Sequence, residues 1–248
     1  MAALDWLTAR PVAHRGLHDA AAGVIENMPA AFNAAIAGHY AIECDVQLSA
    51  DGEAMVHHDF ALGHLTEGQG PLASFSAAEL KRVPFKATAE HMLTLSELCD
   101  LVGGRVPLIV EIKSNFDGAL PLVQRTATVL QNYRGPAAAM SFDPNAVEAL
   151  RAVAPSLTRG IVAERYYRHE EWASLSRAEK TVLGNLLHTF RTRPHFVAYW
   201  VKDLPTLATF AARHLFGLPL LTWTVRTPDD RARAARYASQ IIFEGFRA

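Results

Sequence analysis

Short runs of apolar, β-favouring residues alternate with longer amphipathic runs from one end of the chain to the other. Runs of the first kind are typical of buried strands, and runs of the second kind are typical of helices packed on a sheet. We expect strands at 11–14, 40–48, 107–113, 137–142, 158–162, 195–200, 218–225 and 239–245. We expect helices at 27–38, 94–102, 118–132, 144–153, 172–188, 205–215 and 228–237. The pattern therefore indicates a repeated strand–helix unit.

This alternation favours a parallel sheet, because each helix returns the chain to the same end of the next strand. Eight such units in 248 residues have the size of a closed (β/α)8 TIM barrel. The alternative is an open doubly wound sheet, but "HRGLHDAAAG" after the first strand lacks its GxGxxG turn. No linker divides the chain. We therefore expect an α/β fold in which 1–248 form a single barrel domain, with a short insertion after strand two at about 59–93.

Several expected helices begin with residues whose side chains cap helix N-termini. Thr94, Asp143 before Pro144, and Thr227 before Pro228 fit this pattern, and Asn27 fits it for the first long helix. These positions predict where the helices begin.

The composition narrows the classes of partner. A formal net charge of -1 and a pI near 6.8 give no reason to expect nucleic acid or an anionic membrane as the main partner. The two cysteines, Cys44 and Cys99, are too few for a disulfide scaffold, and Cys44 lies in an apolar strand where a buried thiol is usual. The N-terminus lacks an apolar segment of signal-peptide length, and no apolar stretch is long enough to span a membrane. We therefore expect a cytoplasmic protein.

Pairs of polar residues stand near the ends of the second and third expected strands. Glu43 and Asp45 lie on one face of the second strand, and Glu111 and Lys113 on one face of the third, because side chains alternate along a strand. In a barrel, the C-terminal strand ends meet at the catalytic face. Three carboxylates gathered there would repel one another without a cation, so they predict a divalent ion with oxygen ligands. Each carboxylate alone could instead form a structural salt bridge.

Histidines and cations lie on the same predicted rim. His14 precedes Arg15 after the first strand, and His58 precedes Asp59. Histidine can exchange protons near neutral pH, and arginine can bind an anion. Trp223 fits either the barrel core or an aromatic wall of a ligand pocket. A structural or surface role is expected for the other histidines: His18, His39, His57, His64, His91, His169, His188, His195 and His214. For His18 and His57 a site role is also open, because both lie on the predicted rim.

At these residues the sequence resembles the glycerophosphodiester phosphodiesterase family over essentially the whole chain. The elements that carry the resemblance occur in order: "AHRG" (13–16), "ENMPAAFNAAIAG" (26–38), "IECDVQLSADGEAMVHHD" (42–59), "LTLSEL" (93–98), "LIVEIK" (108–113), "MSFDP" (140–144) and "LTWTV" (221–225). Each element alone is weak, but the combination in register is specific.

The resemblance implies a metal-dependent hydrolysis of glycerophosphodiesters to sn-glycerol 3-phosphate and an alcohol. By position, it implies one divalent cation, Mg²⁺ or Ca²⁺, on Glu43, Asp45 and Glu111. It also implies His14 and His58 as the acid/base pair, and Arg15 and Lys113 as phosphate contacts, with Trp223 added as a substrate-binding residue. His57 occupies a position that the family leaves variable. The implied partner is a small-molecule substrate, with no nucleic acid and no stable membrane association.

Two positions depart from the family pattern. Members commonly read PENT or PENS where this chain has "IENM", so Met28 replaces the capping hydroxyl and Asn27 is left to cap the helix. The family's terminal Ile-Thr-Asp stretch is replaced by "IIFEGFRA", in which Glu244 could supply the missing acid.

Two other functions fit parts of this pattern. A lipid-directed phosphodiesterase, of the phospholipase D-like or phosphoinositide-specific type, should carry an apolar membrane-facing loop. The apolar residues of the insertion are instead scattered among polar ones: Phe60, Leu62, Leu65, Leu72, Phe75 and Phe85. A non-catalytic phosphodiester-binding barrel should have lost a histidine or a carboxylate, whereas all five are present. The pattern does not indicate an oligomeric state.

Overall fold

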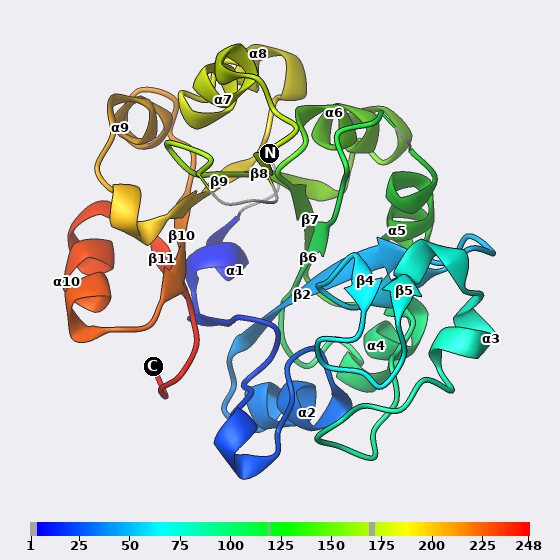
Figure 1. Cartoon of the computed structure of the whole chain (residues 1–248). Helices are drawn as coiled ribbons and strands as arrows, with labels where there is room; N and C mark the ends of the chain where they lie inside the picture. The colour runs from blue at the N-terminus through cyan, green and yellow to red at the C-terminus, as the bar shows by residue number, and fades with distance from the viewer. Residues whose placement is uncertain (1–3, 119, 169–171) are drawn as a thin grey trace.

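The computed structural model describes residues 4–118, 120–168 and 172–248. Parallel strands close into a barrel with helices outside it (Figure 1). These strands are β1 (Val12–Ala13), β2 (Ala41–Leu48), β6 (Leu108–Ile112), β7 (Ala137–Ser141), β8 (Thr158–Ala163), β9 (Phe196–Trp200), β10 (Leu220–Val225) and β11 (Gln240–Phe243). The barrel closes at β1, which pairs in parallel with both β2 and β11. The predicted barrel is confirmed, and the open sheet is excluded.

The α-helices of the described residues follow the expected order along the chain. They are α1 (Asp5–Thr8), α2 (Pro29–Ala37), α3 (Ala77–Leu80), α4 (Leu95–Val102), α5 (Pro121–Gln131), α6 (Pro144–Val153), α7 (Arg177–Gly184), α8 (Thr189–Thr192), α9 (Leu207–His214) and α10 (Pro228–Tyr237). None of these helices is both long enough and apolar enough to cross a membrane.

The helix expected at 172–188 is wrong in extent. Within that range the described residues form one α-helix, α7, and α8 begins after a break, at Thr189. Ser176 accepts a hydrogen bond from the Glu179 N–H and so caps the start of α7. Leu186 has a positive φ of 57°, which a helix cannot contain. The local caps and turns therefore override the longer amphipathic pattern.

Alternation along the strands separates two apolar layers. Ile42, Cys44 and Val46 of β2 belong to the layer between the strands and the outer helices, which also contains Val110. Ala41 and Ile109, on the opposite strand faces, pack in the barrel interior. Residues that share this inward parity near the strand ends therefore point into the barrel mouth.

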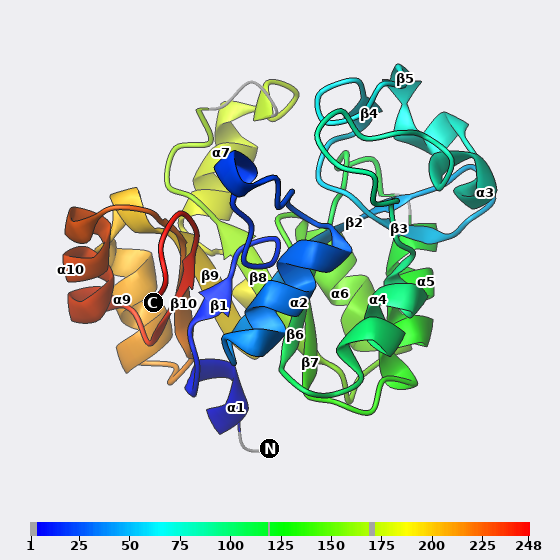
Figure 2. The ribbon, with the colours of Figure 1, turned by 90° about the horizontal axis from the view of Figure 1, so that it is seen from below.

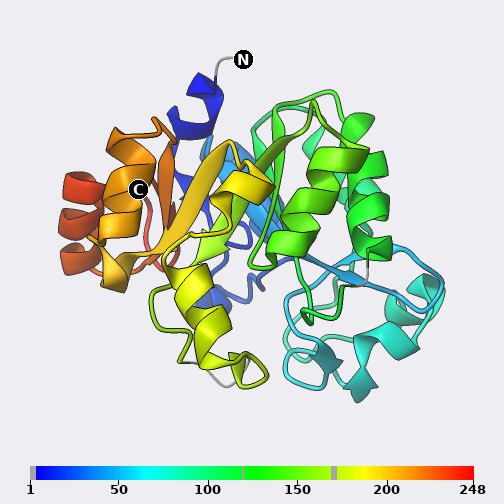
Figure 3. The ribbon, with the colours of Figure 1, turned by 90° about the horizontal axis from the view of Figure 1, so that it is seen from above.

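The end of the barrel opposite the mouth is filled by apolar side chains. Phe196 lies in the interior beside Gly160, where a Cβ atom would approach the Phe196 ring to 2.3 Å. Leu7 of α1 packs against the same interior cluster. Helix α1 lies at this closed end, away from the segment that follows β2 (Figures 2 and 3). Any site that is open to solvent within the barrel therefore lies at the mouth.

The chain leaves the barrel after β2 and forms the predicted insertion. β3 (Ala54–Val56) pairs antiparallel with β2, and a small hairpin follows from β4 (Ala61–Leu62) and β5 (Gly70–Pro71). The insertion has its own buried cluster, in which Met28 and Met55 pack with Leu72 and Phe85. Met28, where the family carries a hydroxyl, is fully buried there. The substitution thus gives apolar contact between the insertion and the barrel.

Three of the four expected caps are confirmed, and one is wrong. The side chains of Thr94, Asp143 and Thr227 each accept a backbone N–H from the helix that follows. Asn27 does not cap α2, whose N-cap is Met28 without a side-chain hydrogen bond. The Asn27 Nδ2 atom instead donates to Asp45 Oδ2 at 3.0 Å. Asn27 is therefore part of the barrel mouth.

Candidate functional site

The turn after β1 depends on the glycine of the HRG triplet. Arg15 and Gly16 both have positive φ, at 54° and 79°. A Cβ atom on Gly16 would lie 2.9 Å from the Ala31 backbone of α2, so no larger residue fits without a shift. The turn directs the Arg15 N–H to Glu43 Oε2 at 3.0 Å. The turn is therefore packed against α2 at Gly16 and bonded to β2 through Arg15.

The three predicted carboxylates converge. Glu43, Asp45 and Glu111 each place an oxygen within 4.8 Å of the others, and all three residues are buried. The Lys113 Nζ atom lies 2.9 Å from Asp45 Oδ1 and 2.6 Å from Glu111 Oε1. The Arg15 Nε atom lies 3.2 Å from Asp45 Oδ2. Two cations thus offset part of the charge of three acids.

The offset is uneven among the acids. Burial raises the pKa of Glu43 well above its usual value, and the neighbouring Asp45 and Glu111 raise it further. Burial also acts to raise the pKa of Asp45, but Lys113 and Arg15 outweigh that effect and hold the pKa well below its usual value. Glu43 Oε1 is buried without a hydrogen-bond partner among the described residues. The cluster is therefore short of positive charge on its Glu43 side.

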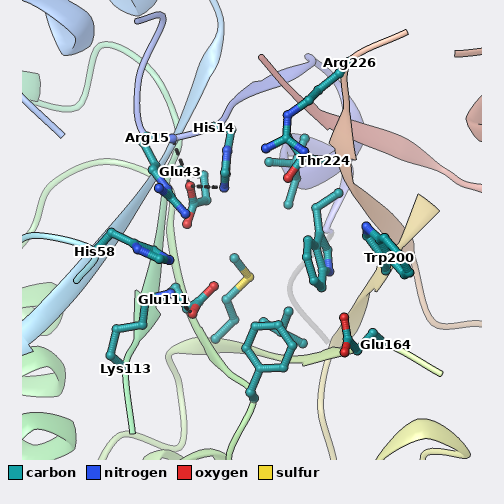
Figure 4. Close-up of a pocket in the computed structure, with 15 residues that line it drawn as sticks. His14, Arg15, Glu43, His58, Glu111, Lys113, Glu164, Trp200, Thr224 and Arg226 are labelled. Atoms are coloured by element: carbon teal, nitrogen blue, oxygen red, sulfur yellow. Dashed lines mark hydrogen bonds and ion pairs between the residues drawn. The ribbon is translucent and has the colours of Figure 1, made fainter. Parts of the chain in front are cut away.

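His14 stands between two acids. Its Nδ1 atom lies 2.5 Å from Glu244 Oε2, and its Nε2 atom lies 3.9 Å from Glu43 Oε2 (Figure 4). Burial lowers the pKa of His14, although the hydrogen bond with Glu244 acts in the opposite direction. Glu244 also lies 2.5 Å from Arg226 Nε. Because Glu244 holds the Nδ1 atom, the Nε2 edge of the His14 ring faces the carboxylate cluster.

His58 has a similar arrangement on the other side of the mouth. Its Nδ1 atom lies 2.8 Å from Asp59 Oδ1, and the Gln47 amide donates to its carbonyl oxygen. The hydrogen bond from His58 lowers the pKa of Asp59, which also bonds the exposed His64. His57, by contrast, is buried against Phe85 of the insertion with ring centroids 6.2 Å apart. The structure therefore gives His57 a packing position and places only His58 at the mouth.

One cavity of about 280 Å³ joins these groups. Its lining comprises His14, Arg15, Glu43, His58, Glu111, Lys113, Met140, Phe142, Val162, Glu164, Trp200, Trp223, Thr224, Arg226 and Ile242 (Figure 4). Trp223 packs on the barrel interior and also lines the cavity. Asp45 lies behind the lining, contacted by Asn27, Arg15 and Lys113. Of the eight predicted site residues, seven line the cavity and Asp45 supports them.

Several lining residues were not predicted from the sequence. Phe142, Glu164 and Arg226 each follow a barrel strand directly, and Trp200 ends one. The strand-end rule that selected Glu111 would also have selected them. Glu26, which lies 2.6 Å from Arg15, carries no such signal, because it follows no strand.

Of the remaining histidines, His18 lies beside the site. His18 Nε2 lies 3.6 Å from Glu244 Oε2, so the site role left open for it keeps a structural basis. His14, His18 and Glu244 form a second group in which ligand atoms lie within 4.8 Å of one another. His169 lies outside the described residues.

Comparisons with known proteins match nearly the whole chain to one family. The model of the glycerophosphoryl diester phosphodiesterase family matches residues 14–243. A glycerophosphodiester phosphodiesterase of Caldanaerobacter subterraneus subsp. tengcongensis is 28% identical over 232 residues, which cover 90% of this chain and 88% of that protein.

Solved structures share the fold. A phosphodiesterase of Oleispira antarctica, in complex with the product sn-glycerol-3-phosphate, has a TM-score of 0.77 at 19% identity, covering 96% of this chain and 94% of that one. A glycerophosphodiester phosphodiesterase of Thermotoga maritima has a TM-score of 0.70 at 22% identity, covering 94% of each chain. Because the family model matches nearly the whole chain, and because the barrel matches these structures, this chain belongs to the glycerophosphoryl diester phosphodiesterase family, whose members are phosphoric diester hydrolases.

Proposed function

We propose that this chain hydrolyses glycerophosphodiesters to sn-glycerol 3-phosphate and an alcohol, with a divalent cation and two histidines. The observation that carries the proposal is the cavity itself. His14, His58, Glu43 and Glu111 line one space with Arg15 and Lys113, although they come from separate parts of the chain. A phosphodiester that entered this space would meet proton-transferring groups and cations together.

The donor set fits a cation. Glu43, Asp45 and Glu111 would supply the oxygen ligands that Mg²⁺ and Ca²⁺ prefer, and buried Glu43 Oε1 still lacks a partner. When bound, the ion would add positive charge beside the non-bridging phosphate oxygens. The cations of the chain would act with it. Lys113 and Arg15 each border the cavity while bonded to Asp45, so their charges are held at its edge.

The histidines would move the protons. One removes the proton from the attacking oxygen, and the other donates a proton to the alkoxide that leaves as the P–O bond breaks. The attacking oxygen is either water or the substrate's own glycerol 2-hydroxyl, which would give a cyclic phosphate that water then opens. Glu244 and Asp59 each hold one ring by Nδ1, so both Nε2 edges remain for this work.

The size of the cavity supports water-soluble substrates. About 280 Å³ accommodates a glycerol and a phosphate but not a long acyl chain. The lining is more apolar than the sequence suggested, since Met140, Phe142 and Trp200 join Trp223. That apolar area is small, so a long acyl chain would gain little burial energy within this cavity.

A release assay tests the proposal. Purified protein is incubated with glycerophosphocholine, glycerophosphoethanolamine, glycerophosphoglycerol and lysophosphatidylcholine, each with Mg²⁺, with Ca²⁺ and with a chelator. We expect sn-glycerol 3-phosphate from the three soluble diesters, loss of turnover with chelator, and recovery on adding metal. Similar rates among the three diesters are expected. A clear preference for the lysolipid would favour the lipid-directed phosphodiesterase, and binding without turnover would favour the non-catalytic barrel.

The single-domain organisation and the cytoplasmic location stay predictions. The buried cluster shared by Met28 and Phe85 supports the first, because it joins the insertion to the segment before α2.

A further inference from the structure

An exposed apolar surface lies on α8, α9 and the loops beside them. We call it the α8–α9 face. Phe190 is 80% exposed and Leu207 is 90% exposed, values unusual for large apolar side chains. The large apolar side chains that these segments expose are Leu187, Phe190, Leu207, Phe210, Leu215 and Phe216. Exposed apolar side chains gathered on one surface indicate an interaction site.

The face contains a groove. A cavity of about 410 Å³ lies between the α7–α8 segment and α9, and mostly apolar side chains line it. Phe190 and Phe216 meet edge to face across it, with ring centroids 6.3 Å apart. The α7–α8 segment and α9 are neighbours on the outside of the barrel (Figure 1). The groove therefore joins two separate segments into one surface.

The charges of these two segments have one sign. Residues 180–202 and 204–228 contain no aspartate or glutamate, although acids and bases are nearly balanced over the whole chain. Arg193 lines the groove, and Arg213 lies on α9. Arg191, Lys202 and Arg226 are each offset by an ion pair with an acid elsewhere in the chain, namely Glu148, Asp230 and Glu244. The face thus combines exposed aromatic and aliphatic side chains with arginines, which suits an anionic partner.

We propose that the α8–α9 face docks reversibly on the surface of a bilayer that contains anionic lipids. Phe190, Phe210 and their apolar neighbours enter the interfacial region, while Arg193 and Arg213 contact lipid phosphates. A symmetric pairing of two copies through this face is less favourable. It would bring the arginines of both copies together, and these segments hold no carboxylate to pair with them.

The position of the face keeps the catalytic cavity free. α8 is followed by the start of β9, and the loop after α9 leads to the start of β10. Strand starts lie at the end of the barrel opposite the mouth. Docking there leaves the mouth open to dissolved substrate. The net charge of -1 and the scattered apolar residues of the insertion argue against stable membrane association, and a reversible association through another face is compatible with both.

Vesicle sedimentation tests the proposal. The full chain is mixed with vesicles of phosphatidylglycerol and phosphatidylcholine, and separately with vesicles of phosphatidylcholine alone. We expect binding only to the anionic vesicles, and its loss in about 0.5 M NaCl, where charges are screened within a few ångströms. Phe190→Ser with Phe210→Ser, and Arg193→Glu with Arg213→Glu, should each weaken binding about tenfold or more. The control is Arg134→Glu, an exposed arginine beyond α5, which should bind as the wild type does.

Hydrolysis of glycerophosphocholine by each variant is measured in the same preparations. Unchanged turnover shows that the variants are folded and separates this proposal from the proposed catalytic function. Equal binding to both vesicle types, or no binding at low salt, would overturn the proposal. So would a concentration-dependent dimer that Phe190→Ser abolishes without any effect on vesicles, because that result would assign the face to a second copy of the chain.

Discussion

Single side chains at the mouth differ in role even where they are neighbours in the sequence. His57 and His58 are adjacent, yet one packs against Phe85 and the other lines the cavity. Burial lowers the pKa of His57, which disfavours its charged form. Both residues follow the end of β3 (Ala54–Val56), and their side chains leave the chain there in different directions.

The histidine pair can be tested by substitution. His14→Ala and His58→Ala should each lower kcat by about 100-fold or more, the usual range for positioned proton transfer. The measurement is turnover of glycerophosphocholine with saturating metal, with circular dichroism to confirm folding. His57→Ala is the matched control, and it should retain most turnover while losing some stability. An indispensable His57 with a dispensable His58 would contradict the assignment.

Glu244 is expected to position His14. Its carboxylate lies 2.5 Å from Nδ1, so Glu244→Gln should weaken the orientation of the ring and lower kcat about tenfold or more, with little change in KM. Glu244→Asp keeps the charge and should recover part of the loss. The pH profile of kcat should shift in Glu244→Gln, whereas a purely structural role would leave the profile unmoved. An unchanged kcat in Glu244→Gln would refute a positioning role.

Among the structural elements, the turn after β1 is constrained both by its backbone conformation and by its packing. Gly16 combines a positive φ with a backbone contact to α2, whereas Gly52, in the turn between β2 and β3, has a positive φ of 86° and open space around it. A substitution at Gly52 therefore tests backbone strain alone, whereas one at Gly16 tests backbone strain together with a steric clash.

Alanine at each glycine measures the two effects. Gly52→Ala should cost about 1 kcal/mol, because only the left-handed backbone is disfavoured. Gly16→Ala should cost more, roughly 2–4 kcal/mol, because the Ala31 backbone must also move. Urea unfolding gives both values. The Gly16→Ala substitution should also lower turnover, because the turn carries His14 and Arg15. Equal costs for the two variants would show that the contact with α2 relaxes freely.

For the whole molecule, stability should depend on a buried histidine remote from the mouth. His188 is buried between α7 and α8, and neither ring nitrogen has a hydrogen-bond partner in the described part of the chain. Burial, with a smaller effect of Arg191, lowers its pKa to about 4. The folded chain therefore binds this proton less readily than the unfolded chain, whose histidine has an ordinary value near 6.5.

The sign of the pH dependence follows from this difference. Above about pH 6.5 both states are neutral at His188 and its contribution is fully present; between about 6.5 and 4 the unfolded state gains the proton first, so stability falls as the pH falls. His188→Gln should remove about 1–3 kcal/mol of the stability loss between about pH 7.5 and pH 4.5. Urea unfolding at both pH values measures the change. The exposed His214→Gln should keep the wild-type dependence, and an identical loss in His188→Gln would disprove the assignment.

Much of this protein was determined by local pattern. Alternation of apolar runs predicted the strands, and period two placed Glu43 with Asp45 and Glu111 with Lys113, because side-chain direction in a strand depends only on parity. Closure of the barrel and the strand-end rule then placed the predicted groups at one mouth. Capping chemistry predicted Thr94, Asp143 and Thr227 for the same reason, since an N-cap acts within one turn.

Only the tertiary structure decided which distant residues serve the mouth. Asn27 stands at the sequence position of a helix cap, yet its side chain donates to Asp45, because the turn before α2 is held against β2. Glu244 reaches His14 only because β11 pairs with β1 when the barrel closes. The α8–α9 face likewise exists because two amphipathic segments, neither unusual alone, lie side by side outside the barrel. Local periodicity fixes the direction of a side chain relative to its own strand or helix, whereas its partners depend on contacts between segments far apart in the chain.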